Sequence, residues 1–115
     1  MNPMIFVRFN VEGFHYWPSA PKGRFYLGQK HRHQFYVEVS CEVKHNDREI
    51  EFHDLLDVSK HYFPGGDMDE DSCEMMAHDL AKKLAYHYDR PFSVSVSEDN
   101  EVGAIVSFDK LRVVK

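Results

Sequence analysis

Cysteine is scarce in this chain: Cys41 and Cys73 are the only two among 115 residues. Two cysteines cannot form the framework of several disulfides that holds many small secreted domains together. A domain of this length buries enough surface to fold without such bridges. We therefore expect both residues to be free thiols in a protein that stays in the reducing cytoplasm.

Long apolar runs and clusters of basic residues are missing as well. No stretch approaches the roughly 20 apolar residues of a membrane-spanning helix, and residues 1–14 lack the basic start of a secretory signal. The formal charge of −5 repels phosphate backbones, and no Lys/Arg cluster offsets it. We expect neither a membrane nor a nucleic acid as a partner.

Repeats, low-complexity stretches and Pro/Gly/Ser-rich linkers do not divide the sequence either. The length is typical of one compact domain. The chain is 43% hydrophobic, with nine Phe and six Tyr, and this composition suits a packed core. We expect residues 1–115 to form a single domain.

Alternation of apolar and polar residues predicts four strands. Residues 31–43 alternate most clearly, and residues 4–12 follow the same period of two. A shorter alternating segment lies at 92–96, and residues 103–109 are expected to form a last strand before a basic tail. Residues 13–30 hold prolines and glycines among aromatics, which predicts a long structured connection between the first two strands.

Helical spacing appears in two segments between these strands. Apolar residues recur at intervals of three and four over residues 52–63 and again from about Ser72 to Tyr88. Ser72 or Asp71 is a suitable N-cap for the second helix. The order β-β-α-α-β-β predicts an α+β fold, an antiparallel sheet with two helices on one face.

Histidine is abundant, with eight in the chain, and His31 and His33 share one face of a predicted strand. Their Cα atoms would lie about 7 Å apart, which suits two ligands converging on one ion. His15, across a turn, could supply a third ligand. Three neutral imidazoles with an open fourth position form the composition of a catalytic zinc site.

A simpler interpretation of the histidine pair stays open at this point, namely two polar residues at the entrance of a strand. Alternation also puts His31 and His33 on the same side as the apolar Phe35 and Val37. Either the histidines lie at the mouth of the core, or a bulge intervenes.

Several segments resemble one enzyme family. HRHQFYVEV is similar to the H-G-H-N-Y-x-V-E-V segment of the 6-pyruvoyl and 6-carboxytetrahydropterin synthases, and VEGFH is similar to their F-x-A-A-H motif. REIEFHDL resembles G-x-x-x-D-F-x-x-L, with Glu51 in place of the aspartate. SCEMMAHDLAKKL resembles P-T-S-E-x-L-A-x-x-L, and VSVSEDNEVGAIVSF resembles V-x-V-x-E-T-x-x-x-G-x-x-Y.

The resemblance implies the tunnelling fold, in which β-β-α-α-β-β subunits join their sheets into a barrel of trimers or hexamers. It implies zinc bound by His15, His31 and His33. It also implies that Glu98 anchors the N–H edge of a pterin by two parallel hydrogen bonds. Ser72 and Glu74 match a segment that touches the ligand. Without the resemblance, Glu98 is a solvated residue at a strand end, and helix capping explains Ser72 equally well.

Departures from the family pattern concern the catalytic groups. Leu27 stands where the family has a cysteine, and no Asp-His dipeptide follows the first helix. His61, Asp67 or Asp69 could substitute, although no motif assigns them. Cys73, expected at a helix N-terminus, should have a lowered pKa. Cys41 lies about 26 Å along the strand from the second histidine, too far to replace the lost thiol.

Two functions follow from these observations. The first is a zinc-dependent, lyase-type enzyme of this superfamily, which acts with altered chemistry on a pterin-, purine- or nucleotide-like molecule. The second is a module that binds such a heterocycle without reaction. The missing cysteine and Asp-His pair favour the second for the family's own reactions, and an open metal position favours the first for some reaction.

Overall fold

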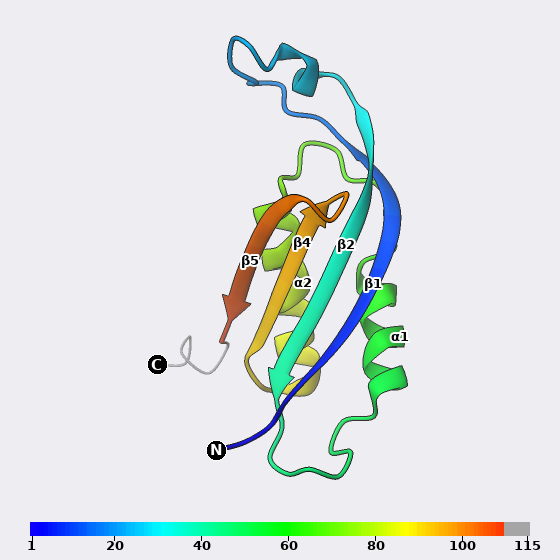
Figure 1. Cartoon of the computed structure of the whole chain (residues 1–115), viewed down its shortest axis with the longest axis vertical. Helices are drawn as coiled ribbons and strands as arrows, with labels where there is room; N and C mark the ends of the chain where they lie inside the picture. The colour runs from blue at the N-terminus through cyan, green and yellow to red at the C-terminus, as the bar shows by residue number, and fades with distance from the viewer. Residues whose placement is uncertain (110–115) are drawn as a thin grey trace.

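Five strands form one sheet in the computed structural model, which describes residues 1–109. The predicted basic tail lies outside the described residues. The strands follow the order β3-β1-β2-β4-β5 across the sheet (Figure 1). Their bounds are Met4–His15 for β1, His31–Glu42 for β2, Gly66–Asp67 for β3, Phe92–Glu98 for β4 and Val102–Phe108 for β5.

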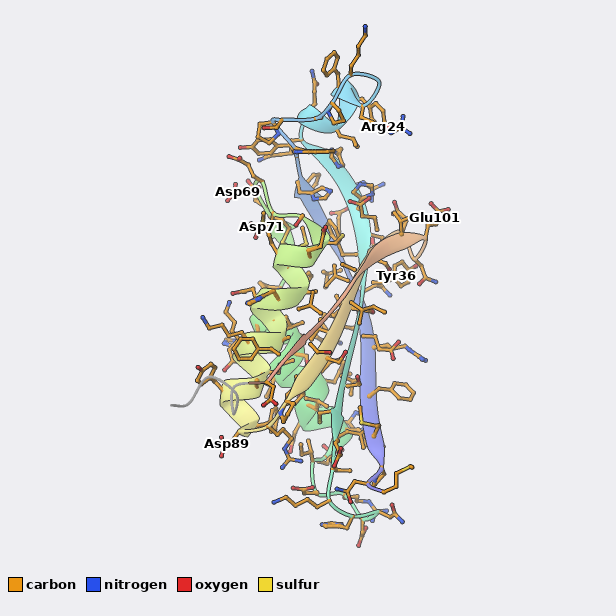
Figure 2. All side chains as sticks on the ribbon, turned by 90° about the vertical axis from the view of Figure 1, so that its left-hand side faces the viewer. Arg24, Tyr36, Asp69, Asp71, Asp89 and Glu101 are labelled. Atoms are coloured by element: carbon orange, nitrogen blue, oxygen red, sulfur yellow. The ribbon has the colours of Figure 1, made fainter. Side chains whose placement is uncertain are left out.

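Two helices pack on one side of this sheet, as Figure 2 shows. α1 spans Phe52–Tyr62 and α2 spans Cys73–Tyr88, close to the predicted bounds. Glu51 caps α1 by accepting hydrogen bonds from two backbone N–H groups, and the Ser72 hydroxyl caps α2 by accepting one, from Met75. The predicted α+β class is confirmed. Neither helix combines the length and apolar character needed to cross a membrane.

The core lies between the helices and the inward face of the sheet. Alternate residues of β2 and β4 are almost fully buried there, and α2 contributes its apolar stripe. The largest fully buried side chains are Phe35, Phe92, Leu55, Leu80 and Leu84. The alternation read from the sequence therefore has the predicted cause, a sheet with one covered face.

The sheet is mixed, so the expectation of a purely antiparallel sheet was wrong. β3 pairs two residues with β1 in parallel, and the other three pairings are antiparallel. Gly65 and Gly66 both have a positive φ, of 82° and 83°. A Cβ on Gly65 would lie 2.6 Å from the Glu12 carbonyl oxygen, so only glycine allows this close approach.

The first strand is longer than predicted. β1 continues through residues 13–15, which were expected to begin the connection, and pairs with the start of β2. The connection itself holds a short 3-10 helix, η1 (Phe25–Gly28). The longer strand matters for the site because it places His15 directly opposite His31 in the sheet.

Candidate metal centre

Three histidines meet where β1 ends and β2 begins. His15 is the register partner of His31, and His33 follows two residues later on the same face. The ring centroids lie 4.5 Å apart for His15 and His31, 4.8 Å for His31 and His33, and 5.3 Å for His15 and His33. The sequence predicted these three residues as ligands, and the fold brings them together.

The cluster lies at the mouth of the core, with a continuous register and no bulge. The rings of His15 and His33 contact the buried Phe35 edge-on, at 5.3 and 5.8 Å between centroids. Gly13, opposite His33, makes room for that phenyl ring, because a Cβ there would lie 2.8 Å from it. Phe35 thus forms a rigid apolar floor beneath the histidines.

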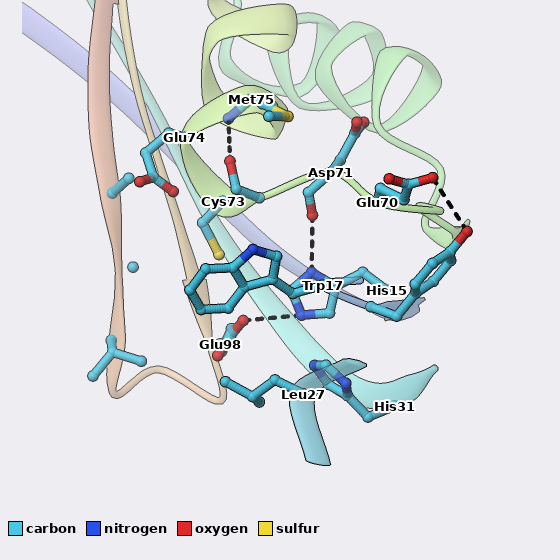
Figure 3. A pocket seen from close by; sticks show the side chains of 15 residues that line it. His15, Trp17, Leu27, His31, Glu70, Asp71, Cys73, Glu74, Met75 and Glu98 are labelled. Carbon is cyan, nitrogen blue, oxygen red and sulfur yellow. Dashed lines mark hydrogen bonds and ion pairs between the residues drawn. The ribbon is translucent and has the colours of Figure 1, made fainter. Parts of the chain in front are cut away.

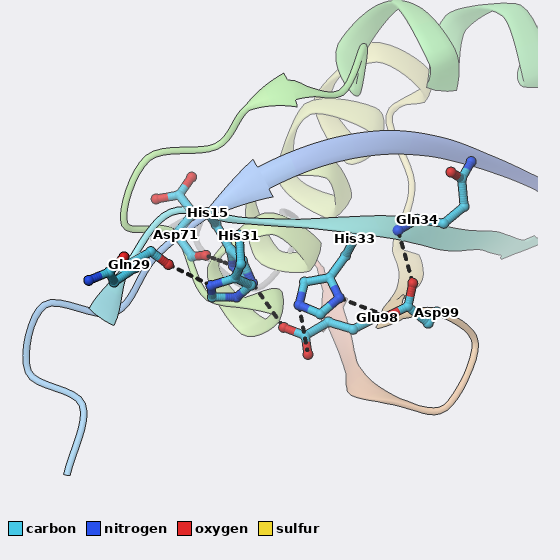
Figure 4. Close-up of polar contacts among 8 residues, drawn as sticks. All are labelled: His15, Gln29, His31, His33, Gln34, Asp71, Glu98 and Asp99. Carbon is cyan, nitrogen blue, oxygen red and sulfur yellow. Dashed lines mark hydrogen bonds and ion pairs between the residues drawn. The ribbon is translucent and has the colours of Figure 1, made fainter. Parts of the chain in front are cut away.

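Each histidine has its Nδ1 held by an oxygen acceptor. Nδ1 of His15 lies 2.9 Å from the Asp71 carbonyl oxygen, and Nδ1 of His31 lies 2.8 Å from that of Gln29. Nδ1 of His33 lies 2.7 Å from Oδ2 of Asp99 (Figure 4). Carbonyl and carboxylate oxygens only accept hydrogen bonds, so the proton of each neutral ring sits on Nδ1. The Nε2 lone pairs are then free to bind a metal.

Asp99 lies in the turn after β4, and its carboxylate contacts two neighbouring residues of β2, His33 and Gln34. Its Oδ1 accepts a hydrogen bond from the Gln34 backbone N–H at 3.1 Å. The hydrogen bond from His33, together with that from Gln34, lowers the pKa of the Asp99 carboxyl below its ordinary value of 3.8. Asp99 is therefore a carboxylate at neutral pH and orients the His33 ring.

Glu98 faces the same centre from β4. Its Oε2 lies 3.0 Å from Nε2 of His15, and its Oε1 lies 3.6 Å from Nε2 of His33. Within the described residues 1–109, neither buried Nε2 atom has a hydrogen-bond partner. Nitrogen lone pairs that face carboxylate lone pairs repel each other, unless a proton or a cation lies between them.

One ligand atom from each of these four residues can be chosen so that all lie within 4.8 Å of one another. The cluster of His15, His31, His33 and Glu98 could therefore hold a metal ion. Two coordination patterns fit this arrangement. Three imidazoles leave a fourth position open, whereas Glu98 as a fourth ligand would close a tetrahedral site.

A cavity of about 450 Å³ adjoins the cluster (Figure 3). His15 and Trp17 contribute from the end of β1 and the residues after it, Leu27 from η1, and Glu98 from β4. Cys73, Glu74 and Met75 from the first turn of α2 also line it. The predicted ligand-binding residues Ser72, Glu74 and Glu98 all line this cavity. The Ser72 hydroxyl also caps the helix, since it accepts a hydrogen bond from the Met75 N–H at 3.2 Å.

The expected low pKa of Cys73 was wrong. The residue is the first of α2 and lines the cavity, but it is 7% exposed. Burial, together with the charges of Glu98 and Glu74, raises the pKa of the Cys73 thiol to about 12. Loss of water from a thiolate outweighs the favourable end of the helix dipole here. Both cysteines are free thiols, as predicted from the composition, and both are buried.

The residues considered as substitutes for the missing Asp-His pair do not line the cavity. The Asp67 carboxylate accepts a hydrogen bond from Lys30 at 2.7 Å, and it also accepts one from the backbone N–H of Asp69. His61 contacts Tyr62 near the end of α1. Leu27 does line the cavity, but an alkyl side chain cannot transfer a proton.

Sequence reasoning missed the residues that orient the histidines. Asp99 is 66 residues from His33 in the chain, and Asp71 and Gln29 act through backbone carbonyls, which no side-chain pattern reveals. Asp99 did carry one signal, because it directly follows the glutamate that the motif singled out.

In comparisons with known proteins, no family model matches this chain and no curated protein sequence matches it. The resemblance to the tetrahydropterin synthases therefore stays a prediction that rests on the quoted motifs. The geometry of the four side chains stands independently of it.

Proposed function

We propose that this protein binds one zinc ion per chain through His15, His31 and His33 and acts as an enzyme on a pterin-, purine- or nucleotide-like small molecule. One observation carries the proposal: each histidine has its Nδ1 anchored by an oxygen, and one possible ligand atom from each of the three and from Glu98 lies within 4.8 Å of the others. This anchoring is typical of metal-bound imidazoles, whose second nitrogen donates to a carboxylate or carbonyl.

Zinc suits this donor set best. Imidazole nitrogen is a favoured zinc ligand, and three such ligands with a fourth position for water or substrate is the pattern of catalytic zinc. Zinc bound there would polarise a substrate oxygen and ease proton shifts next to a carbonyl. Glu98 would accept two N–H groups from the edge of a planar heterocycle in the adjoining cavity.

A second candidate function is binding without reaction. The position of the family's cysteine holds Leu27, and the pKa of Cys73, about 12, keeps that thiol protonated at neutral pH. Acidic residues line the cavity, but no observation singles out one of them as the catalytic base. Turnover of a bound heterocycle by the zinc-loaded protein would favour the enzyme, and binding that leaves the ligand unchanged would favour the module.

Assembly into a trimer or hexamer is part of this proposal. Among the strands that the structure describes, β5 pairs with β4 alone, and the face of the sheet away from the helices exposes apolar side chains such as Phe6 and Ile105. Joining edges between subunits would cover both features. Light scattering should give three or six times the mass of the chain, and a uniform monomer at micromolar concentration would contradict the assembly.

The direct test of the proposal is the content of the purified protein. Elemental analysis should find close to one zinc per chain, and affinity should fall on acidification because protons compete for the ligand nitrogens. Mass spectrometry of any small molecule released by denaturation would identify the natural ligand. A protein with no zinc after expression and dialysis against zinc would overturn the assignment.

A further inference from the structure

The cavity beside the metal centre carries a strong excess of negative charge. Four acidic residues line it, namely Glu70, Asp71, Glu74 and Glu98, and within residues 1–109 no Lys or Arg is among its lining residues. A bound Zn²⁺ would leave a net charge of about −2 from these groups. A phosphate ester carries a similar negative charge at neutral pH, so the cavity repels it.

Basic side chains near the histidines are already paired outside the cavity. Lys30, which precedes His31, is 2.7 Å from Asp67. Arg32, between the two histidines of β2, is 3.0 Å from Glu12. Neither cation lines the cavity, so neither provides a place for a phosphate there.

A second observation places the metal position at this cavity. His15 is 8% exposed and lines the cavity, and its buried Nε2, which the metal would take, has no hydrogen-bond partner among residues 1–109. Apolar side chains complete the walls, among them Trp17, Leu27, Met75 and Val102. A volume of about 450 Å³ lies in the range of small-molecule sites and exceeds what one fused heterocycle needs.

We propose that this site takes an unphosphorylated, uncharged or cationic heterocycle whose N–H groups face the carboxylates, and that it rejects the phosphorylated form of the same compound. The inference rests on the proposed function and narrows its ligand from three classes to bases and nucleosides of the pterin or purine type. Carboxylates accept N–H donors, and the indole and aliphatic walls cover the faces of the ring.

The test compares matched pairs on zinc-loaded protein. Guanosine and guanosine 5′-monophosphate form one pair, and neopterin and neopterin monophosphate form the other. Ligand-observed NMR titration measures each dissociation constant, also for weak binders. We expect the unphosphorylated member of at least one pair to bind about tenfold or more tightly than its phosphate ester, with a smaller ratio at high salt.

A charge variant makes the cause specific. Glu70→Gln with Glu74→Gln removes two carboxylates of the cavity and should raise affinity for the phosphorylated members by about tenfold. Asp47→Asn with Asp57→Asn removes two carboxylates that do not line the cavity, and should leave both affinities unchanged.

Equal or tighter binding of the phosphate esters would overturn the inference, as would a failure of all four compounds to bind protein that holds zinc. An equal effect of the two double variants would overturn the electrostatic cause. Failure to load zinc at all would instead refute the proposed function, so the two failures are distinguishable.

Discussion

Partly buried polar side chains lie near both ends of the sheet, but they are paired differently: an ion pair of Arg90 and Glu49 at one end and the histidine cluster with Glu98 at the other. At one end Arg90 is 2.7 Å from Glu49 and donates to the Glu42 carbonyl at 3.1 Å, and Glu49 also accepts from the Lys44 N–H. Opposite charges meet there, and in the described part of the chain Nε of Arg90 is the one buried atom of this pair without a hydrogen-bond partner. At the other end, histidine nitrogens face the Glu98 carboxylate, and two of them, Nε2 of His15 and of His33, lack hydrogen-bond partners within residues 1–109.

This difference separates a structural ion pair from a ligand site. Arg90 and Glu49 satisfy most of each other's hydrogen-bonding capacity, so the pair needs no third component. The histidine cluster is incomplete without a proton or a cation, although its outer nitrogens are carefully held. Buried lone pairs that converge without donors are therefore the more informative sign of function.

The largest expected effect is the loss of metal on removal of two ligands. His31→Ala with His33→Ala should reduce bound zinc from about one per chain to near zero, because one imidazole cannot hold the ion alone. Elemental analysis after dialysis measures it. His45→Ala with His53→Ala, two histidines outside the cluster, is the matched control and should retain full zinc. Full occupancy in the first variant would refute the site.

Glu98→Gln tests whether this carboxylate serves the ligand or the metal. If Glu98 accepts two N–H groups of the ligand, the glutamine NH₂ would face one of these donors. The lost binding free energy would be on the order of 2–3 kcal/mol. Affinity for a pterin or guanine-like compound should fall by about 30- to 150-fold, with zinc content unchanged. Calorimetry and elemental analysis measure the two quantities.

The outcome decides between the open and closed metal sites. Loss of zinc in Glu98→Gln would show that Glu98 is the fourth ligand and that no coordination position is open. Equal heterocycle affinity in wild type and variant would place the ligand elsewhere.

Asp99→Asn should weaken the metal centre more modestly. Asparagine accepts the positive φ of 55° at this position and keeps an oxygen for the Gln34 N–H, but it loses the charge that orients His33. Zinc affinity should fall by about 10-fold or somewhat more, measured by competition with a chelator. Glu101→Gln, in the same turn, is the control. Equal zinc affinity in Asp99→Asn and wild type would contradict the orienting role.

The smallest effect is expected at the opposite end of the sheet. The hydrogen bond from Arg90, with that from the Lys44 N–H, lowers the pKa of Glu49 from 4.5 to about 2. This lowered pKa contributes stability that is present above about pH 4.5 and is lost as the pH falls through 2. Glu49→Gln should therefore flatten that part of the stability profile without changing zinc content.

Urea unfolding of the metal-free protein between pH 2 and 7 measures this contribution. Glu101→Gln again serves as the control and should leave the profile unchanged between pH 4.5 and 2. A Glu49→Gln profile as steep as that of wild type would show that the ion pair with Arg90 does not form in solution.

The sequence by itself determined both helices, four of the five strands and three of the four clustered side chains, but neither β3 nor the last three residues of β1. Alternation along residues 31–43 fixes which face of β2 is buried, because side chains in a strand point to opposite sides in turn. The same period places His31 and His33 together. Caps and helical spacing placed α1 and α2 within a residue or so, since those signals are local.

Only the tertiary structure decided how the site is completed. The pairing of β1 with β2 brings His15 opposite His31, and Glu98 reaches the cluster because β4 joins the other side of β2. The environment also reversed the expected pKa of Cys73, because burial depends on what packs around the helix end. Contacts between residues far apart in the chain, such as His33 and Asp99, depend on strand register, which no local pattern encodes.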